Sequence, residues 1–145
     1  MFRGNHPTRV DEKGRLKIPA DFKRVAEEKY GSQFYITSVD GVAAQIWPMP
    51  EWEKKEQQVL GMPSLPAKQK WLDLTSYYGQ VAEMDAQGRV LLPQLLRESA
   101  DLVAEVAVLG KLIHLEVVNH GKVKTKIEAA PMTGADWDSL AGHGF

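Results

Sequence analysis

Cationic side chains of the kind that bind anions gather in one short stretch, residues 9–19, with the sequence RVDEKGRLKIP. Arg15 and Lys17 alternate with Leu16 and Ile18, which predicts a half-buried strand with a cationic outer face. An Arg side chain at such a place can bind guanine or phosphate. It can equally pair with a nearby carboxylate, Asp11 or Glu12. The residues alone leave both roles open for Arg15.

The charge of the chain is unevenly distributed. Residues 1–24 hold seven basic and three acidic side chains, a net charge of +4, although the whole chain has a net charge of −1. A nearly neutral chain counts against an extended nucleic-acid-binding face, which is usually basic. The basic charge that does exist surrounds residues 9–19.

Signals of enzymatic chemistry are missing from the sequence. The chain has no cysteine, no phosphate-binding glycine loop and no Gly-x-Ser-x-Gly sequence. Its histidines lack the spacing of metal ligands; they are His6, His114, His120 and His143. We therefore expect no catalytic activity, no cofactor and no metal ion, and a small barrel enzyme is the weakest alternative. With neither a signal sequence nor a membrane-length apolar segment, we expect a cytoplasmic protein.

Local elements must position the cationic stretch. Asp11 to Gly14 has the composition of a type I turn, with Asp at its first position and Gly at its fourth. Residues 15–18 form the predicted strand. Pro19 ends that strand and opens a helix that we expect to reach about Lys29.

The same stretch returns as residues 83–93, EMDAQGRVLLP, displaced by 74 positions. The shared positions pair Asp11 with Asp85, Gly14 with Gly88, Arg15 with Arg89, and Pro19 with Pro93. We expect the aspartates to cap turns, the glycines to satisfy backbone geometry and the prolines to begin helices. The second copy is less basic, because Gln87 stands where Lys13 stands and Leu91 where Lys17 stands.

The repeat divides the chain into three parts. We expect a first unit over residues 1–61, a connector and helix over 62–79, and a second unit over 80–145 with a divergent C-terminal extension. Strands are predicted at 8–10, 33–38, 43–47, 80–84, 89–92, 106–109 and 112–118, with an extra edge strand at 122–127. Helices are predicted at 51–60, at 67–77, after Pro93 with Leu95, Leu96 and Ala100 buried, and from about Thr133.

Three features together resemble a known family. They are the N-terminal Met1-Phe2-Arg3-Gly4, the two Asp-x-x-Gly-Arg motifs, and Trp47-Pro48-Met49-Pro50-Glu51-Trp52. In combination they resemble MraZ, a family of bacterial transcriptional regulators associated with the division and cell-wall gene cluster. The similarity covers roughly residues 1–118. Each half also resembles the AbrB/SpoVT DNA-binding fold.

This resemblance implies a mainly β fold with peripheral helices, in which two pseudo-repeats form a swapped-hairpin β-barrel. It also implies a ring-shaped homo-oligomer that binds short repeated boxes of double-stranded DNA upstream of its own operon, mostly as a repressor. Such a protein would be associated with the nucleoid.

The resemblance also implies roles for single residues. Arg15 is expected to be the leading base or phosphate contact, and Lys13 and Lys17 flank it as phosphate contacts. The expected outer contacts are Arg3 and Arg9, and the weaker contacts of the second copy are Arg89 and Gln87. Because only the first copy has basic neighbours around its arginine, we expect it to be the main DNA-facing motif and the second copy to be its structural twin.

The runner-up function is that of an AbrB-like antitoxin or interaction module without promoter-specific regulation. Antitoxins of that kind usually carry one DNA-binding unit and a long disordered extension. Here a second complete unit follows the first, which favours the transcriptional regulator.

Overall fold

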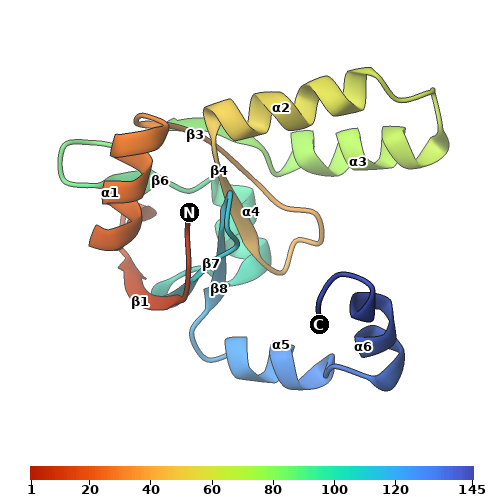
Figure 1. Cartoon of the computed structure of the whole chain (residues 1–145). Helices are drawn as coiled ribbons and strands as arrows, with labels where there is room; N and C mark the ends of the chain where they lie inside the picture. The colour runs from red at the N-terminus through yellow and green to blue at the C-terminus, as the bar shows by residue number, and fades with distance from the viewer.

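The computed structural model describes residues 1–145. An antiparallel sheet of eight strands curves into a nearly closed barrel, and six helices lie outside it (Figure 1). The strands are β1 (Asn5–Val10), β2 (Arg15–Lys17), β3 (Gln33–Thr37), β4 (Ala44–Pro48), β5 (Gln80–Glu83), β6 (Arg89–Leu91), β7 (Ala104–Gly110) and β8 (Leu115–Asn119). The helices are α1 (Ala20–Lys29), α2 (Met49–Leu60), α3 (Pro66–Tyr77), α4 (Gln94–Ala100), α5 (Val123–Ala129) and α6 (Gly134–Ala141).

Pairs of strands from the two halves alternate around the barrel. The strand order is β5-β3-β4-β8-β7-β1-β2-β6, so β1 of the first half pairs with β7 of the second, and β5 pairs with β3. The edge strands β5 and β6 also contact each other, which nearly closes the sheet. Exchanging the two halves leaves this circular order unchanged. The predicted swapped-hairpin barrel with peripheral helices is therefore confirmed.

The two copies of the motif meet at the pairing of β2 with β6. Leu16 lies opposite Val90 at the centre of this pair. Beyond its two ends, the N–H of Ile18 donates to the carbonyl of Gly88 at 2.8 Å, and the N–H of Leu92 donates to that of Gly14 at 3.0 Å. The two bonds are equivalent under the 74-residue offset. Each copy therefore donates one further backbone hydrogen bond to the other, beyond the end of the paired strands.

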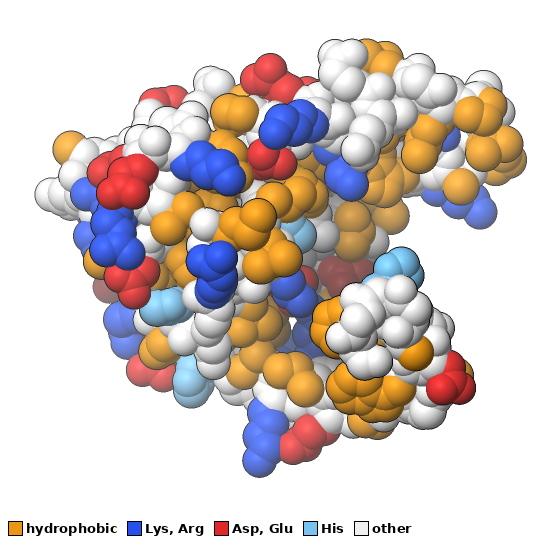
Figure 2. Space-filling model, viewed as in Figure 1, with side chains coloured by type: hydrophobic (Ala, Val, Ile, Leu, Met, Phe, Trp, Pro, Cys, Tyr) orange, Lys and Arg blue, Asp and Glu red, His pale blue; other side chains and the backbone are white.

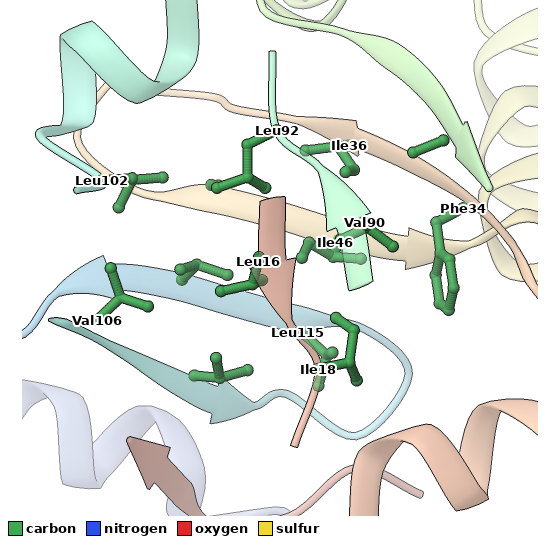
Figure 3. Close-up of a cluster of buried hydrophobic side chains, with 14 of the residues drawn as sticks. Leu16, Ile18, Phe34, Ile36, Ile46, Val90, Leu92, Leu102, Val106 and Leu115 are labelled. Carbon is green, nitrogen blue, oxygen red and sulfur yellow. The ribbon is translucent and has the colours of Figure 1, made fainter. Parts of the chain in front are cut away.

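The apolar residues of both motifs supply the barrel core (Figure 3). Leu16, Ile18, Val90 and Leu92 are each at most 1% exposed, whereas Arg15 and Lys17 keep contact with solvent. Burial of one such aliphatic side chain stabilises a fold by about 1.5–3 kcal/mol. The core thus fixes which face of β2 and β6 the charged residues occupy.

Each motif leads directly into a helix. α1 begins after Pro19 and α4 after Pro93, whose φ angles of −53° and −56° suit the start of a helix. α4 buries Leu96 and Ala100. The prediction that Leu95 is buried was wrong, because only one stripe of this short helix meets the barrel and Leu95 lies outside it, 47% exposed.

Helices α2 and α3 form an antiparallel arm that projects from the barrel (Figure 1). Trp52 of α2 is buried and stacks on Tyr35 of β3, with ring centroids 4.6 Å apart. Trp52 also stacks on Trp71 of α3, with ring centroids 5.6 Å apart. Aromatic stacking therefore holds the base of this arm, while α3 buries only Thr75.

The C-terminal segment differs from the sequence prediction. Residues 122–127, predicted as an edge strand, instead lie in and just before helix α5. β8 already has β4 on one side and β7 on the other, so no free sheet edge is available to pair with this segment. Its lysines form ion pairs instead, such as Lys126 with Glu116 at 2.7 Å. None of the six helices combines the length and hydrophobicity that a membrane span requires.

The hairpin between β7 and β8 is also wider than predicted. Residues 112–114 lie outside the strand, and Leu112 has a positive φ of 67°. Leu112 instead forms an isolated bridge with Phe2, which anchors the N-terminus. The predicted terminal helix is present as α6. It begins with a capping box in which Thr133 and Asp136 exchange hydrogen bonds between side chain and backbone.

Candidate nucleic-acid interface

The first motif forms a turn held by its aspartate. One carboxylate oxygen of Asp11 accepts hydrogen bonds from the backbone N–H groups of Lys13 at 3.0 Å and Arg15 at 2.9 Å. The other oxygen accepts from Nε of the Arg15 side chain at 2.8 Å. Gly14 closes the turn with φ +84°, a conformation that favours glycine. The aspartate thus fixes both the turn and the base of the Arg15 side chain.

The second motif repeats this geometry. Asp85 accepts the N–H groups of Gln87 and Arg89, both at 2.9 Å, and the Arg89 Nε, also at 2.9 Å. Gly88 has φ +77°. Ion pairing with the aspartate, left open from the sequence, therefore occurs at both arginines. The hydrogen bond uses Nε, and the terminal guanidinium nitrogens of Arg15 and Arg89 make no hydrogen bond within the protein.

These hydrogen bonds lower the pKa of both aspartates. For Asp11 the largest cause is the backbone N–H of Arg15, and for Asp85 it is the backbone N–H of Arg89. The Arg side chains lower both pKa values further, and burial opposes the shift. A carboxyl group whose pKa is lower in the folded protein stabilises the fold above its unfolded pKa, about 3.9. That stability is lost as the pH falls.

Acid unfolding should consequently show two windows. Burial lowers the pKa of His114, which stacks on Trp47, to about 4, so stability should decline first between about pH 6.5 and 4 as the unfolded state gains a proton. Protonation of Asp11 and Asp85 should cause the further loss below about pH 4. Melting curves across pH 2.5–7 measure both. The double variant Asp11→Asn/Asp85→Asn should reduce the loss in the lower window only, where Asp136, whose pKa is also lowered, still contributes.

An open groove of about 800 Å³ adjoins the first motif. Its apolar lining residues include Val10, Leu102 and Val103. Six basic side chains and two acidic ones line it, namely Arg9, Lys13, Arg15, Lys17, Arg89 and Arg97 with Asp11 and Glu12. Both motifs thus contribute arginines to one surface with an excess of positive charge.

The groove contains most of the residues that were predicted to contact DNA. Lys13 is exposed on the first turn. The amine of Lys17 donates to the carbonyl of Gln87, so it ties the two motifs together. Arg9 faces its register partner Glu105 across β1 and β7, with the charged groups 3.5 Å apart and largely exposed. Exposed pairs of this kind contribute little to stability and can exchange partners.

Two predicted contacts lie apart from this groove. Arg3 precedes β1 and lies beside Gly110, at the end of the strand opposite the first turn. At about 3.3 Å per residue, the length of β1 separates it from the groove by roughly 20 Å. Gln87 is exposed on the second turn, at the other end of the β2–β6 pair, and does not line the groove.

Arg97 is a groove residue that the sequence reading missed. It belongs to α4, its Nε donates to the carbonyl of Leu92 at 3.1 Å, and its guanidinium lies over Gly14. Lys23 of α1 lies over Gly88 in the same way. The two cations are 74 positions apart, so the repeat itself was the signal. Each half delivers a basic side chain to the turn of the other.

Replacement of Gly14 by Val should lower the melting temperature. A valine at φ +84° is strained by about 1–3 kcal/mol, and its Cβ would meet Arg97 Cζ at 2.3 Å. For a chain of this size we expect a fall of roughly 3–12 °C, measured by calorimetry. Gly31→Val has a similarly strained φ of +103° but no atom within 4 Å of its Cβ, so it should show the cost of strain without the contact with Arg97 and lose less stability. A melting temperature equal to that of the wild type would contradict the structural role of Gly14.

A family model described as "MraZ protein, putative antitoxin-like" matches residues 1–74 and 80–121. The chain belongs to the MraZ family. Two relatives, each named Transcriptional regulator MraZ, align over the full length of both chains. The MraZ protein of Acidobacterium capsulatum is 61% identical, and that of Koribacter versatilis is 54% identical. The MraZ protein of Neisseria meningitidis is 32% identical over 97% of this chain and 93% of its own.

The MraZ match includes both motifs and the whole barrel. It ends at residue 121, just before α5. The C-terminal arm formed by α5 and α6 thus lies outside the part that the MraZ model matches.

Proposed function

We propose that this protein is a sequence-specific DNA-binding transcriptional regulator that acts on repeated boxes upstream of its own division and cell-wall operon, mostly as a repressor. The observation that carries this proposal is the groove in which arginines of both motifs converge. The names of its MraZ relatives, each a transcriptional regulator, support a role in transcription.

The β2–β6 pair is suited to binding in the major groove of DNA. The major groove of B-DNA admits a two-stranded β-ribbon. Arg15, Lys17 and Arg89 occupy the outer face of this ribbon, opposite the buried Leu16 and Val90. The terminal nitrogens of Arg15 donate hydrogen bonds to a base or a phosphate, while its Nε donates to Asp11. Lys13 and Arg9 bind phosphates beside it, and Arg97 is a further cation on the same surface.

A single copy has few phosphate contacts, and affinity for DNA grows with the number of phosphates neutralised. We propose that several copies in a ring-shaped homo-oligomer present the same motif to successive boxes. Linking the contacts raises affinity without requiring a highly basic chain. An assembly spread over several boxes of a promoter would also block access to it, which accounts for repression.

Binding to the DNA upstream of the protein's own gene tests the proposal. Fluorescence anisotropy would compare a labelled upstream duplex with a shuffled duplex of equal length and composition at a fixed salt concentration. We expect the upstream duplex to bind at least about 10³-fold more tightly. Equal affinities for the two duplexes would reject promoter-specific regulation.

The alternative is an antitoxin-like or interaction module, which the description of the family model favours. This function needs no preference for upstream DNA. Equal binding to both duplexes, together with tight binding of a protein partner, would establish it instead.

A further inference from the structure

The C-terminal arm, α5 with α6, packs few of its side chains against the barrel. Neither helix has a buried residue. Four large apolar side chains of residues 123–145 are at least half exposed, namely Ile127, Met132, Trp137 and Phe145. Trp137 is 53% exposed. Contiguous exposed apolar patches are where proteins bind partners.

A second apolar surface lies on the first arm, between α2 and α3. A groove of about 340 Å³ runs beside Val59, Met62, Leu65 and Trp71. Leu65 is 52% exposed, and Leu60 nearby is also exposed. Figure 2 shows hydrophobic atoms at the outer end of this arm and on the C-terminal arm, with an open space between the two.

The charges around the two surfaces are complementary. The lining of the groove includes Lys55 and Lys68 and no carboxylate. In α6, Asp136 and Asp138 stand on either side of Trp137, and the helix has no basic residue. Asp136 also caps α6 through Thr133, whereas no hydrogen bond or ion pair of the protein engages the Asp138 carboxylate. The acidic neighbours of Trp137 are therefore opposite in sign to the two lysines that line the apolar groove. Such complementarity sets the partner and the orientation of an interface.

We propose that the C-terminal arm of one copy docks in the α2–α3 groove of the next copy, with Trp137 as the anchor. The inference rests on the assembly proposed above and names its interface. Because the two surfaces differ, the contact is head-to-tail, and repetition of a head-to-tail contact produces a closed ring if the rotation closes. In such a ring both apolar arms of every copy are covered, whereas pairing of two α6 helices would leave every α2–α3 groove exposed.

Two substitutions separate the two sides of this interface. Trp137→Ala removes the anchor and leaves the groove intact. Leu65→Asp puts a carboxylate into the groove, and because Leu65 is the N-cap of α3, where Asp is favoured, the helix should persist. Size-exclusion chromatography with light scattering should show each variant at the monomer mass of 16.2 kDa. Leu95→Ala, an exposed leucine on α4, is the control and should keep the wild-type mass.

Mixing the two variants gives the decisive result. The α6 of a Leu65→Asp chain can still enter the groove of a Trp137→Ala chain, so the mixture should form 1:1 pairs and nothing larger. Variants that keep the wild-type mass would overturn the proposed interface alone. Dimers of Leu65→Asp by itself, or no pairs in the mixture, would also overturn it. A monomeric wild type would overturn the proposed assembly as well. Binding of the wild type and the two variants to a single-box duplex would test DNA recognition separately.

Discussion

Replacement of Arg15 by Ala should abolish specific DNA binding while the fold and the oligomer persist. A lost arginine contact to a base costs about 1–3 kcal/mol, which is roughly a 5- to 150-fold loss of affinity for each motif. In an assembly that engages several boxes these losses compound. The fold should persist because Asp11 remains exposed to water after its partner is removed. Gel-shift assays and size-exclusion chromatography measure the two properties in the same sample.

Arg89→Ala is the matched control for this variant. It breaks the equivalent ion pair with Asp85 in the second copy, and that copy has Gln87 and Leu91 where the first has lysines. Its loss of DNA affinity should be smaller than that of Arg15→Ala. If Arg15→Ala binds DNA normally, or if its oligomer dissociates, the assignment of DNA recognition to Arg15 is wrong.

The number of boxes in a DNA probe should have the second large effect. Binding should weaken steeply, by roughly 10²- to 10⁴-fold, when a probe with several boxes is reduced to one. The reason is that a chain of net charge −1 offers few phosphate contacts alone and gains affinity from repeated presentation of one motif. Titration of probes of equal length with one, two or three intact boxes measures this effect.

Spacing provides the control for this second prediction. Insertion of half a helical turn, about 5 base pairs, between boxes turns neighbouring boxes to opposite faces of the duplex. Such a probe should bind more weakly than the native one, although it contains the same boxes. Equal affinity for one box and for several would show that each motif binds alone.

The central part of the fold could be predicted because several sequence signals agree there. At β2 the alternation of Arg15 and Lys17 with Leu16 and Ile18 gave both the strand and its buried face. Pro19 and Pro93 gave the starts of two helices. The swapped pairing of β1 with β7 and of β5 with β3 is not a local property, and it came from the family resemblance.

Other features depend on tertiary contacts that no local pattern contains. The alternation in residues 122–127 is compatible with a strand, and only the occupied edges of β8 decide for a helix. Leu95 looked like part of a buried stripe, but the barrel meets a narrower face of α4. Arg97 reached the candidate site through the crossing of the two halves, which places α4 over the turn of the first motif.

Footprinting of the DNA upstream of the protein's own gene tests the central claim most directly, with the wild type and Arg15→Ala side by side. We predict that the wild type protects a series of short, evenly spaced repeats and that Arg15→Ala at the same concentration protects none of them. Absence of protection by the wild type, or the same footprint with both proteins, would contradict the assignment of this surface to promoter recognition.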